Sequence, residues 1–130
     1  MREITIGCAQ LGPIQKDERR AGVVDRLIAL LEQASGRDAT LVVFPELALT
    51  TFFPRWYMED RAEIDAWFER DMPNDATRPL FDRARELGVG MYLGYAELTP
   101  EGQHFNTSIL TNTTGEIVLK YRKIHLPGHS

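Results

Sequence analysis

The chain has 130 residues, of which 43% are hydrophobic and 26% charged, with a formal net charge of -4 and an isoelectric point near 5.4. The acidic balance, with Lys and Arg interspersed among acids, argues against a nucleic-acid partner, and no apolar run approaches the ~20 residues that span a bilayer. A single cysteine and an amino terminus without a signal pattern fit a cytoplasmic globular domain that has no disulfide framework and no membrane partner.

The amino-terminal part predicts alternating strands and helices. Residues 3–10 have strand character, and Cys8 within them is expected to be a small buried hydrophobe, since nothing nearby would activate its thiol. Apolar side chains recur at helical spacing over 19–34, and Gly36 is placed to end that helix. Residues 42–44 are an apolar run typical of a buried strand. This order favours parallel pairing of the two strands with a right-handed crossover.

The strand at 42–44 leads directly into Pro45 and Glu46. Because Pro45 has no amide hydrogen, sheet pairing should stop there and leave Glu46 at the carboxyl edge of the sheet, where open α/β sheets bind ligands. Two interpretations of Glu46 follow. It either takes part in chemistry at this edge, or it caps the free amides of a following helix.

The middle of the chain predicts two further helices and a long strand. Helical spacing covers 62–70 and 78–87, and Gly88 is placed to end the second helix. Residues 89–98 predict a strand in which Gly90 and Gly94 mark the close approach of another backbone. Residues 105–110 and 116–121 flank a turn at 111–115 and predict a hairpin.

The last predicted strand directs a lysine to its apolar side. Alternation places Lys123 on the same face as Leu119 and Tyr121, whereas Lys120 and Arg122 share the opposite face, which is expected to be solvated. An ammonium group directed inward needs a carboxylate partner or a functional reason, since burying it unpaired is costly. The alternative is a lysine at the end of a strand whose ammonium reaches water.

Other polar and aromatic side chains also have two interpretations. The loop at 52–56 either covers a substrate pocket or packs onto the core. An asparagine beside a strand either positions pocket groups or satisfies local backbone, and a strand-end glutamate lies either near a site or in solvent. A histidine among turn-like residues is expected to be exposed. These candidates are Phe53, Pro54 and Arg55 in the loop, then Asn106, Glu97 and His104.

Three motifs together resemble the nitrilase superfamily of carbon–nitrogen hydrolases. They occur in the family's order and at compatible spacing over essentially the whole chain. They are Phe44-Pro45-Glu46, Phe105-Asn106-Thr107-Ser108 and Tyr121-Arg122-Lys123-Ile124-His125-Leu126-Pro127-Gly128. Within this superfamily, residues 47–56, residues 94–98 and the closing Gly128-His129 most resemble the N-carbamoyl-D-amino-acid amidohydrolases.

The resemblance implies an α/β fold, the amino-terminal half of an α-β-β-α sandwich. Residues 1–130 would form a partial domain that includes strands of both sheets, and its apolar sheet faces would be exposed. Exposed faces and edges of this kind favour self-association. The family requires no metal or other cofactor, and its members are homo-oligomers, so the intact protein is expected to be one as well.

The resemblance also assigns chemistry. Glu46 would be the general base and Lys123 would stabilise the developing oxyanion, with the pKa of Glu46 raised by a secluded pocket. Phe53, Pro54, Arg55, Asn106 and His129 would bind substrate. The family's nucleophilic cysteine is expected downstream of Lys123 and is missing from these residues, whose one cysteine is Cys8.

Three functions follow from the resemblance. The first is hydrolysis of N-carbamoyl-D-amino acids to the D-amino acid, ammonia and carbon dioxide. The second is the activity of an amidase or a β-ureidopropionase of the same superfamily. The third is a truncated, non-catalytic piece of such an enzyme, for which the missing cysteine is the reason.

Overall fold

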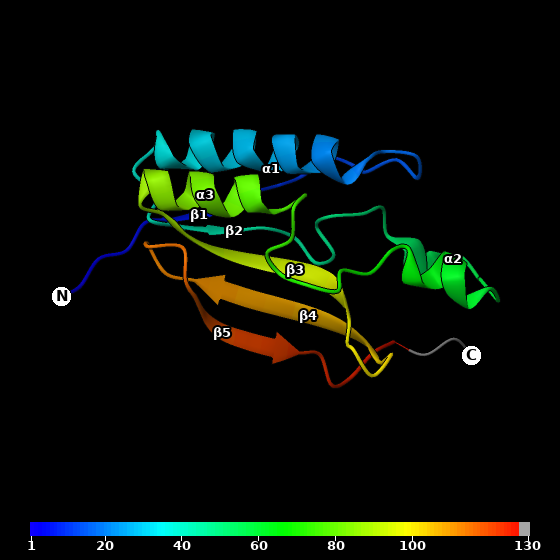
Figure 1. Cartoon of the computed structure of the whole chain (residues 1–130). Helices are drawn as coiled ribbons and strands as arrows, with labels where there is room; N and C mark the ends of the chain where they lie inside the picture. The colour runs from blue at the N-terminus through cyan, green and yellow to red at the C-terminus, as the bar shows by residue number, and fades with distance from the viewer. Residues whose placement is uncertain (128–130) are drawn as a thin grey trace.

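The computed structural model describes residues 1–127, and within them five strands form one sheet (Figure 1). The strands lie in sequence order, and the first three pair in parallel whereas the last two pair antiparallel. They are β1 (Ile6–Cys8), β2 (Leu41–Val43), β3 (Gly90–Leu98), β4 (His104–Thr111) and β5 (Ile117–Arg122). The predicted parallel pairing, the hairpin and the mixed α/β class are confirmed.

The hairpin does not belong to a second sheet, so the expectation of strands from both sheets of a sandwich is wrong for residues 1–127. β4 pairs with β3 along nearly its whole length, from Tyr92 opposite Leu110 to Leu98 opposite His104. β5 then pairs with β4, with a register shift at Leu110 and Thr111. β3 recruits β4 and β4 in turn recruits β5, so both hairpin strands extend the parallel sheet.

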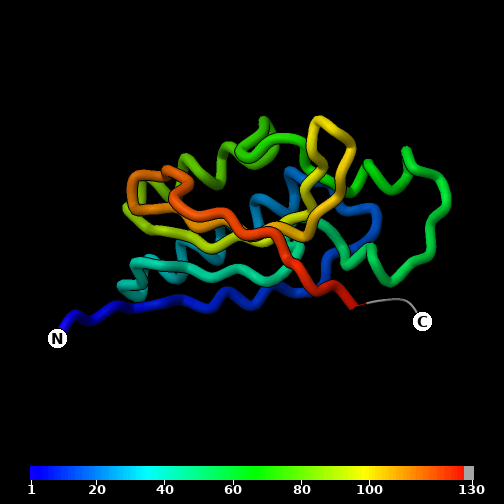
Figure 2. The backbone as a smooth tube through the Cα atoms, turned by 90° about the horizontal axis from the view of Figure 1, so that it is seen from below, coloured from blue at the N-terminus to red at the C-terminus, as the bar shows by residue number. Residues whose placement is uncertain are grey.

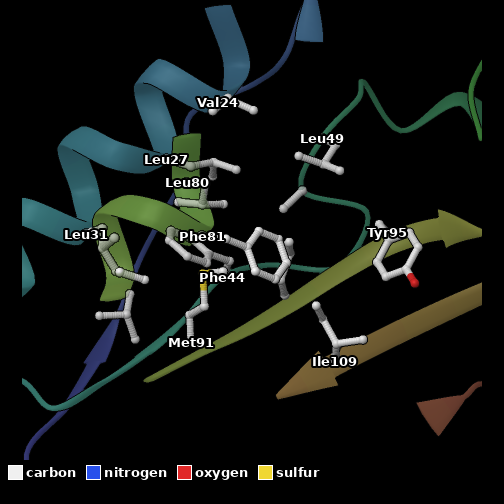
Figure 3. Packing of buried hydrophobic residues seen from close by; sticks show 14 of the residues in the cluster. Val24, Leu27, Leu31, Phe44, Leu49, Leu80, Phe81, Met91, Tyr95 and Ile109 are labelled. Atoms are coloured by element: carbon white, nitrogen blue, oxygen red, sulfur yellow. The ribbon is translucent and has the colours of Figure 1, made fainter. Parts of the chain in front are cut away.

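Helices α1 (Arg20–Ser35) and α3 (Arg78–Leu87) cover one face of this sheet, as Figure 1 shows. Their apolar stripes meet the strands in one core. Figure 3 shows side chains of both helices, such as Leu27 and Phe81, pointing toward Phe44 and Met91. α3 ends as predicted at Gly88, whose φ of 66° is one that glycine adopts without strain.

Helix α2 (Arg61–Asp65) is shorter than the predicted helix over 62–70. The reason is a backbone contact with β3: the Glu69 amide donates to the Ala96 carbonyl at 2.7 Å, and the Leu98 amide donates to the Glu69 carbonyl at 2.9 Å. Residue 69 is thereby held as an extension of the sheet and cannot continue a helix. No helix within residues 1–127 is long and apolar enough to cross a membrane.

The other face of the sheet has apolar side chains that no helix covers. Leu119 and Tyr121 of β5 are 56% and 51% exposed, and Ile6 of β1 is 49% exposed. Cys8 is exposed as well, so the expectation that it is buried is wrong. β1 is an edge strand, and nothing in residues 1–127 packs on this part of it. The exposed apolar sheet face expected from the resemblance is present.

Candidate active site

The chain between β2 and η1 (Phe53–Arg55) presents Glu46 at the carboxyl edge of the sheet. The Phe44 amide donates to the Tyr92 carbonyl, and the Ala48 amide donates to the Gly94 carbonyl, both at 2.9 Å. Residues 44–48 are therefore fastened along β3. The sequence prediction that Gly94 admits another backbone is confirmed, because a Cβ atom on Gly94 would lie 3.2 Å from the Cα of Glu46.

The backbone of Lys123 continues the ladder beyond the end of β5, since its amide donates to the Asn106 carbonyl at 2.8 Å. Seen from below, the stretch that follows β5 runs toward the segment that follows β2 (Figure 2). These two segments, far apart in sequence, place Lys123 and Glu46 together. The Lys123 ammonium donates a hydrogen bond to Oε1 of Glu46 at 2.9 Å.

Asn106 of β4 completes a group of three polar side chains. Its side-chain amide donates to the same oxygen, Oε1 of Glu46, at 2.6 Å. Within residues 1–127, Oε2 of Glu46 accepts no hydrogen bond. One carboxylate oxygen is thus held in place while the other is available to accept a proton. The alternative in which Asn106 serves only local backbone is wrong.

The Lys123 ammonium is the main cause of the electrostatics of Glu46. Its hydrogen bond lowers the pKa of the Glu46 carboxyl below the ordinary value, burial opposes this, and the hydrogen bond from Asn106 lowers the pKa further. The expectation of a raised pKa is wrong, because the Glu46 side chain is 48% exposed and a cation already contacts it. Glu46 is therefore ionised at neutral pH.

A cavity of about 280 Å³ opens beside this polar group. Glu46, Asn106 and Lys123 form its polar part, and the rest of its wall is mainly apolar. Those other residues are Leu47, Phe52, Phe53, Pro54, Phe68, Ala96, His104, Phe105, Leu126 and Pro127. An aromatic and aliphatic wall with one charged corner suits a small ligand that has an apolar part and one polar reacting group.

The loop residues named from the sequence divide between this cavity and the core. Phe53 and Pro54 line the cavity, and Phe53 is also buried against Trp67, with ring centroids 5.7 Å apart and planes 8° from parallel. Phe53 therefore lines the cavity and also packs onto the core. Arg55 lies outside that cavity and lines an adjacent one of about 260 Å³, which also contains Glu46 and Phe52 in its wall. His129 lies outside the described residues.

His104 lines the cavity, although the sequence predicted that it would be exposed. Its side chain is only 30% exposed, and Nε2 lies 2.5 Å from Oδ1 of Asp65 at the end of α2. Its ring meets that of Phe68 edge-on, with centroids 4.5 Å apart. The alternation of side chains along β4 could have indicated this position, because residues 104 and 106 share one face of a strand. Once Asn106 is a candidate, His104 is its neighbour.

The described residues contain no group of three His, Cys, Asp or Glu side chains that could hold a metal ion. Cys8 lies on β1 and lines neither cavity. The site in residues 1–127 therefore consists of a carboxylate, an ammonium group and an amide beside an apolar wall.

A family model described as carbon-nitrogen hydrolase matches residues 5–130. The chain belongs to the carbon-nitrogen hydrolase family. Among curated relatives, a nitrilase of Paraburkholderia phymatum is 30% identical over 95% of this chain and 37% of its own length. An omega-amidase of Xenopus tropicalis is 24% identical over 79% of this chain and 34% of its own. The chain spans little more than a third of these relatives.

Solved structures of the same family share the fold. A carbon-nitrogen hydrolase of Helicobacter pylori superposes with a TM-score of 0.80 at 23% identity, over 95% of this chain and 40% of that one. An amidase of Nesterenkonia sp., described with acrylamide added at its active-site cysteine, gives a TM-score of 0.75 at 22% identity, over 98% of this chain and 46% of that one. These likenesses establish the nitrilase-like fold.

Gly94→Ala tests whether β3 fixes the position of Glu46 in this hydrolase domain. The added Cβ would meet backbone atoms of residues 45–47 at 3.2–3.4 Å, so the segment must shift. We expect the pKa of Glu46 to rise toward its ordinary value as the shifted segment moves Glu46 away from Lys123, and stability to fall by about 1–2 kcal/mol. Carbon-detected NMR titration and urea unfolding measure the two effects.

The matched control for this variant is Gly22→Ala in helix α1, where an added Cβ meets nothing within 4 Å. Alanine is a better helix former than glycine by about 1 kcal/mol, so this variant should be more stable and leave the pKa of Glu46 unchanged. An unchanged Glu46 titration in Gly94→Ala would show that β3 does not position the carboxylate.

Proposed function

We propose that this chain contributes the acid–base and oxyanion groups of a thiol-dependent carbon–nitrogen hydrolase. The observation that carries the proposal is the contact of Lys123 and Asn106 with one oxygen of Glu46, at the polar corner of an apolar cavity. The thiol comes from outside these 130 residues, since Cys8 lines neither cavity. A non-catalytic role remains the second candidate, and it is favoured by that same position of Cys8.

In this mechanism, Oε2 of Glu46 accepts the proton of the thiol, and the thiolate attacks the carbon of the scissile C–N bond. The developing oxygen anion accepts a hydrogen bond from the Lys123 ammonium, and the proton held by Glu46 passes to the departing nitrogen. Glu46 then takes a proton from water, the hydroxide adds to the thioester, and the thiol leaves with that proton. Overall, one water is consumed, and an acid and an amine are released.

The ionised state of Glu46 at rest fits the first of these steps. A carboxyl group that is ionised at neutral pH is ready to accept a proton without first losing one. Asn106 keeps the carboxylate oriented while the ammonium turns from Oε1 toward the substrate oxygen. In the absence of substrate, the charges of Glu46 and Lys123 thus neutralise each other.

The wall of the larger cavity suits an apolar acyl or side-chain group. The N-carbamoyl-D-amino acids expected from the sequence also carry a carboxylate, for which the Arg55 guanidinium in the adjacent cavity is a partner, since both cavities contain Glu46 and Phe52. We therefore propose N-carbamoyl-D-amino acids with an apolar side chain as substrates. Simple amides, for which Arg55 would have no role, are the alternative.

A chimera tests the proposal. Residues 1–130 replace the matching part of the Nesterenkonia amidase, with the junction chosen so that the amidase supplies its active-site cysteine. We expect ammonia release from N-carbamoyl-D-phenylglycine or phenylacetamide by the chimera, and none by the 130-residue chain alone. If Arg55 binds the carboxylate, Arg55→Met raises the KM of the first substrate only.

Two results would contradict the proposal. A chimera with a cooperative unfolding transition that hydrolyses neither substrate would favour the non-catalytic role. Turnover by the 130-residue chain alone that survives Cys8→Ala would exclude a thiol mechanism, because Cys8 is its one cysteine.

A further inference from the structure

A second carboxylate, Glu97, lies on β3 and is only 7% exposed. Its side chain reaches across β4 to β5. Arg122 donates from Nε to Oε1 at 2.7 Å and from Nη2 to Oε2 at 3.2 Å, and the Lys120 ammonium also donates to Oε2. Lys120 and Arg122 lie on an exposed strand as predicted, but both are paired with Glu97 and so are not ordinary solvated charges.

Glu97 has no free oxygen with which to take part in chemistry. Oε1 also accepts a hydrogen bond from the Thr107 hydroxyl at 2.9 Å, so each oxygen has two donors. Glu97 lines neither cavity. A buried carboxylate with both oxygens occupied by side chains of β4 and β5 is an anchor for these strands.

β5 needs such an anchor because few other contacts fix which side chains lie on which face of the strand. It is the edge strand of the sheet, and all six of its residues are exposed. Its pairing with β4 contains a register shift. In a strand, a slip of one residue moves every side chain to the opposite face. Without a specific contact, backbone pairing alone would have to decide which face Lys123 occupies.

The hydrogen bonds of Glu97 to Lys120 and Arg122 specify which face of β5 Lys123 occupies. Lys120 and Arg122 alternate with Tyr121 and Lys123, so holding the first two on one face directs Lys123 to the other, where Glu46 lies. Arg122 also connects the anchor to the cavity wall, because its guanidinium lies over the ring of Phe105, 4.3 Å from the centroid.

We infer that Glu97 is a positioning residue that places the Lys123 ammonium on Glu46 by holding Lys120 and Arg122 on the opposite face of β5. The relevance of Glu97 to catalysis rests on the proposed function, but the placement of the Lys123 ammonium by Glu97 does not. The test therefore uses the titration of Glu46 in the 130-residue chain and requires no turnover.

Glu97→Gln should raise the pKa of Glu46 toward the value that Lys123→Ala gives in the same experiment. Carbon-detected NMR of the Glu46 carboxyl measures both values. The sign separates positioning from a direct charge effect: removing a negative charge would by itself lower the pKa of a nearby carboxyl. In the double variant, Glu97→Gln should add nothing to the effect of Lys123→Ala, since Glu97 acts through that lysine.

Glu69→Gln is the matched control. Glu69 is also 7% exposed, and its carboxylate accepts hydrogen bonds from Arg20 and Asn74, none of which belongs to β5. Its loss should reduce stability and leave the Glu46 titration unchanged. If Glu97→Gln does not fold, Thr107→Val removes one uncharged donor to Oε1 of Glu97 and should raise the pKa of Glu46 by a smaller amount, with no charge removed. A folded Glu97→Gln or Thr107→Val protein with an unchanged or lowered Glu46 pKa would overturn the inference.

Discussion

Lys123→Ala in the chimera should lower kcat about 100- to 1000-fold, the typical cost of removing one donor that stabilises an oxyanion. KM should change little, because the Lys123 ammonium is bound to Oε1 of Glu46 at rest and turns to the substrate oxygen as charge develops there. Steady-state ammonia release measures both constants. Glu46→Gln should lower kcat about 100- to 10,000-fold, which is the range for the loss of a general base.

Lys16→Ala is the control for this prediction, since Lys16 lines neither cavity. Its activity should equal that of the parent chimera. Lys123→Arg should not restore full activity, because a planar guanidinium cannot replace a compact ammonium in this corner. The double variant Glu46→Gln with Lys123→Ala should lose much less than the product of the single losses, as expected for groups that act as a unit. Equal kcat values for Lys123→Ala and Lys16→Ala would remove Lys123 from the reaction.

The elements that the sequence predicted well are those whose pattern is local. α1, α3 and β3 each carry an apolar periodicity over many residues, and Gly88 marks the end of α3 by its own conformational freedom. α2 was overestimated because its end is set by Glu69, which pairs with β3. The hairpin was predicted, but the sheet that it joins depends on pairing between strands, which periodicity does not encode.

The site required information that no local pattern contains. Glu46 and Lys123 are 77 positions apart, and strand alternation placed each only at an edge or on a face. The resemblance to the carbon–nitrogen hydrolases is what joined them. The predicted direction of the pKa shift at Glu46 was wrong for the same reason. That direction depends on the distance from Glu46 to the ammonium and on the exposure of the carboxylate. Phe68, which follows α2, and His104 of β4 were missed because the cavity wall is assembled from separate elements.

The anchor carboxylate Glu97 also predicts how this protein responds to acid. Burial acts to raise its pKa, but hydrogen bonds from Arg122, Lys120 and Thr107 outweigh burial and lower the pKa of Glu97 to about 2 from an ordinary value of 4.5. A folded-state pKa below that of the unfolded chain means that the ionised group stabilises the fold. This stabilisation is complete above pH 4.5 and is lost as the pH falls toward 2.

We expect this loss to be about 2–3 kcal/mol, somewhat less than the full shift implies, since solvent reaches the two cations and screens them. Urea unfolding of the wild-type chain and of Glu97→Gln, at several pH values between 2 and 6, isolates the contribution of Glu97 from that of other carboxylates. A carboxamide resembles a protonated carboxyl in shape and does not titrate. The two proteins should therefore differ most near pH 6 and converge near pH 2, whereas a difference that is constant with pH would mean that Glu97 stabilises the fold by packing and not by its charge.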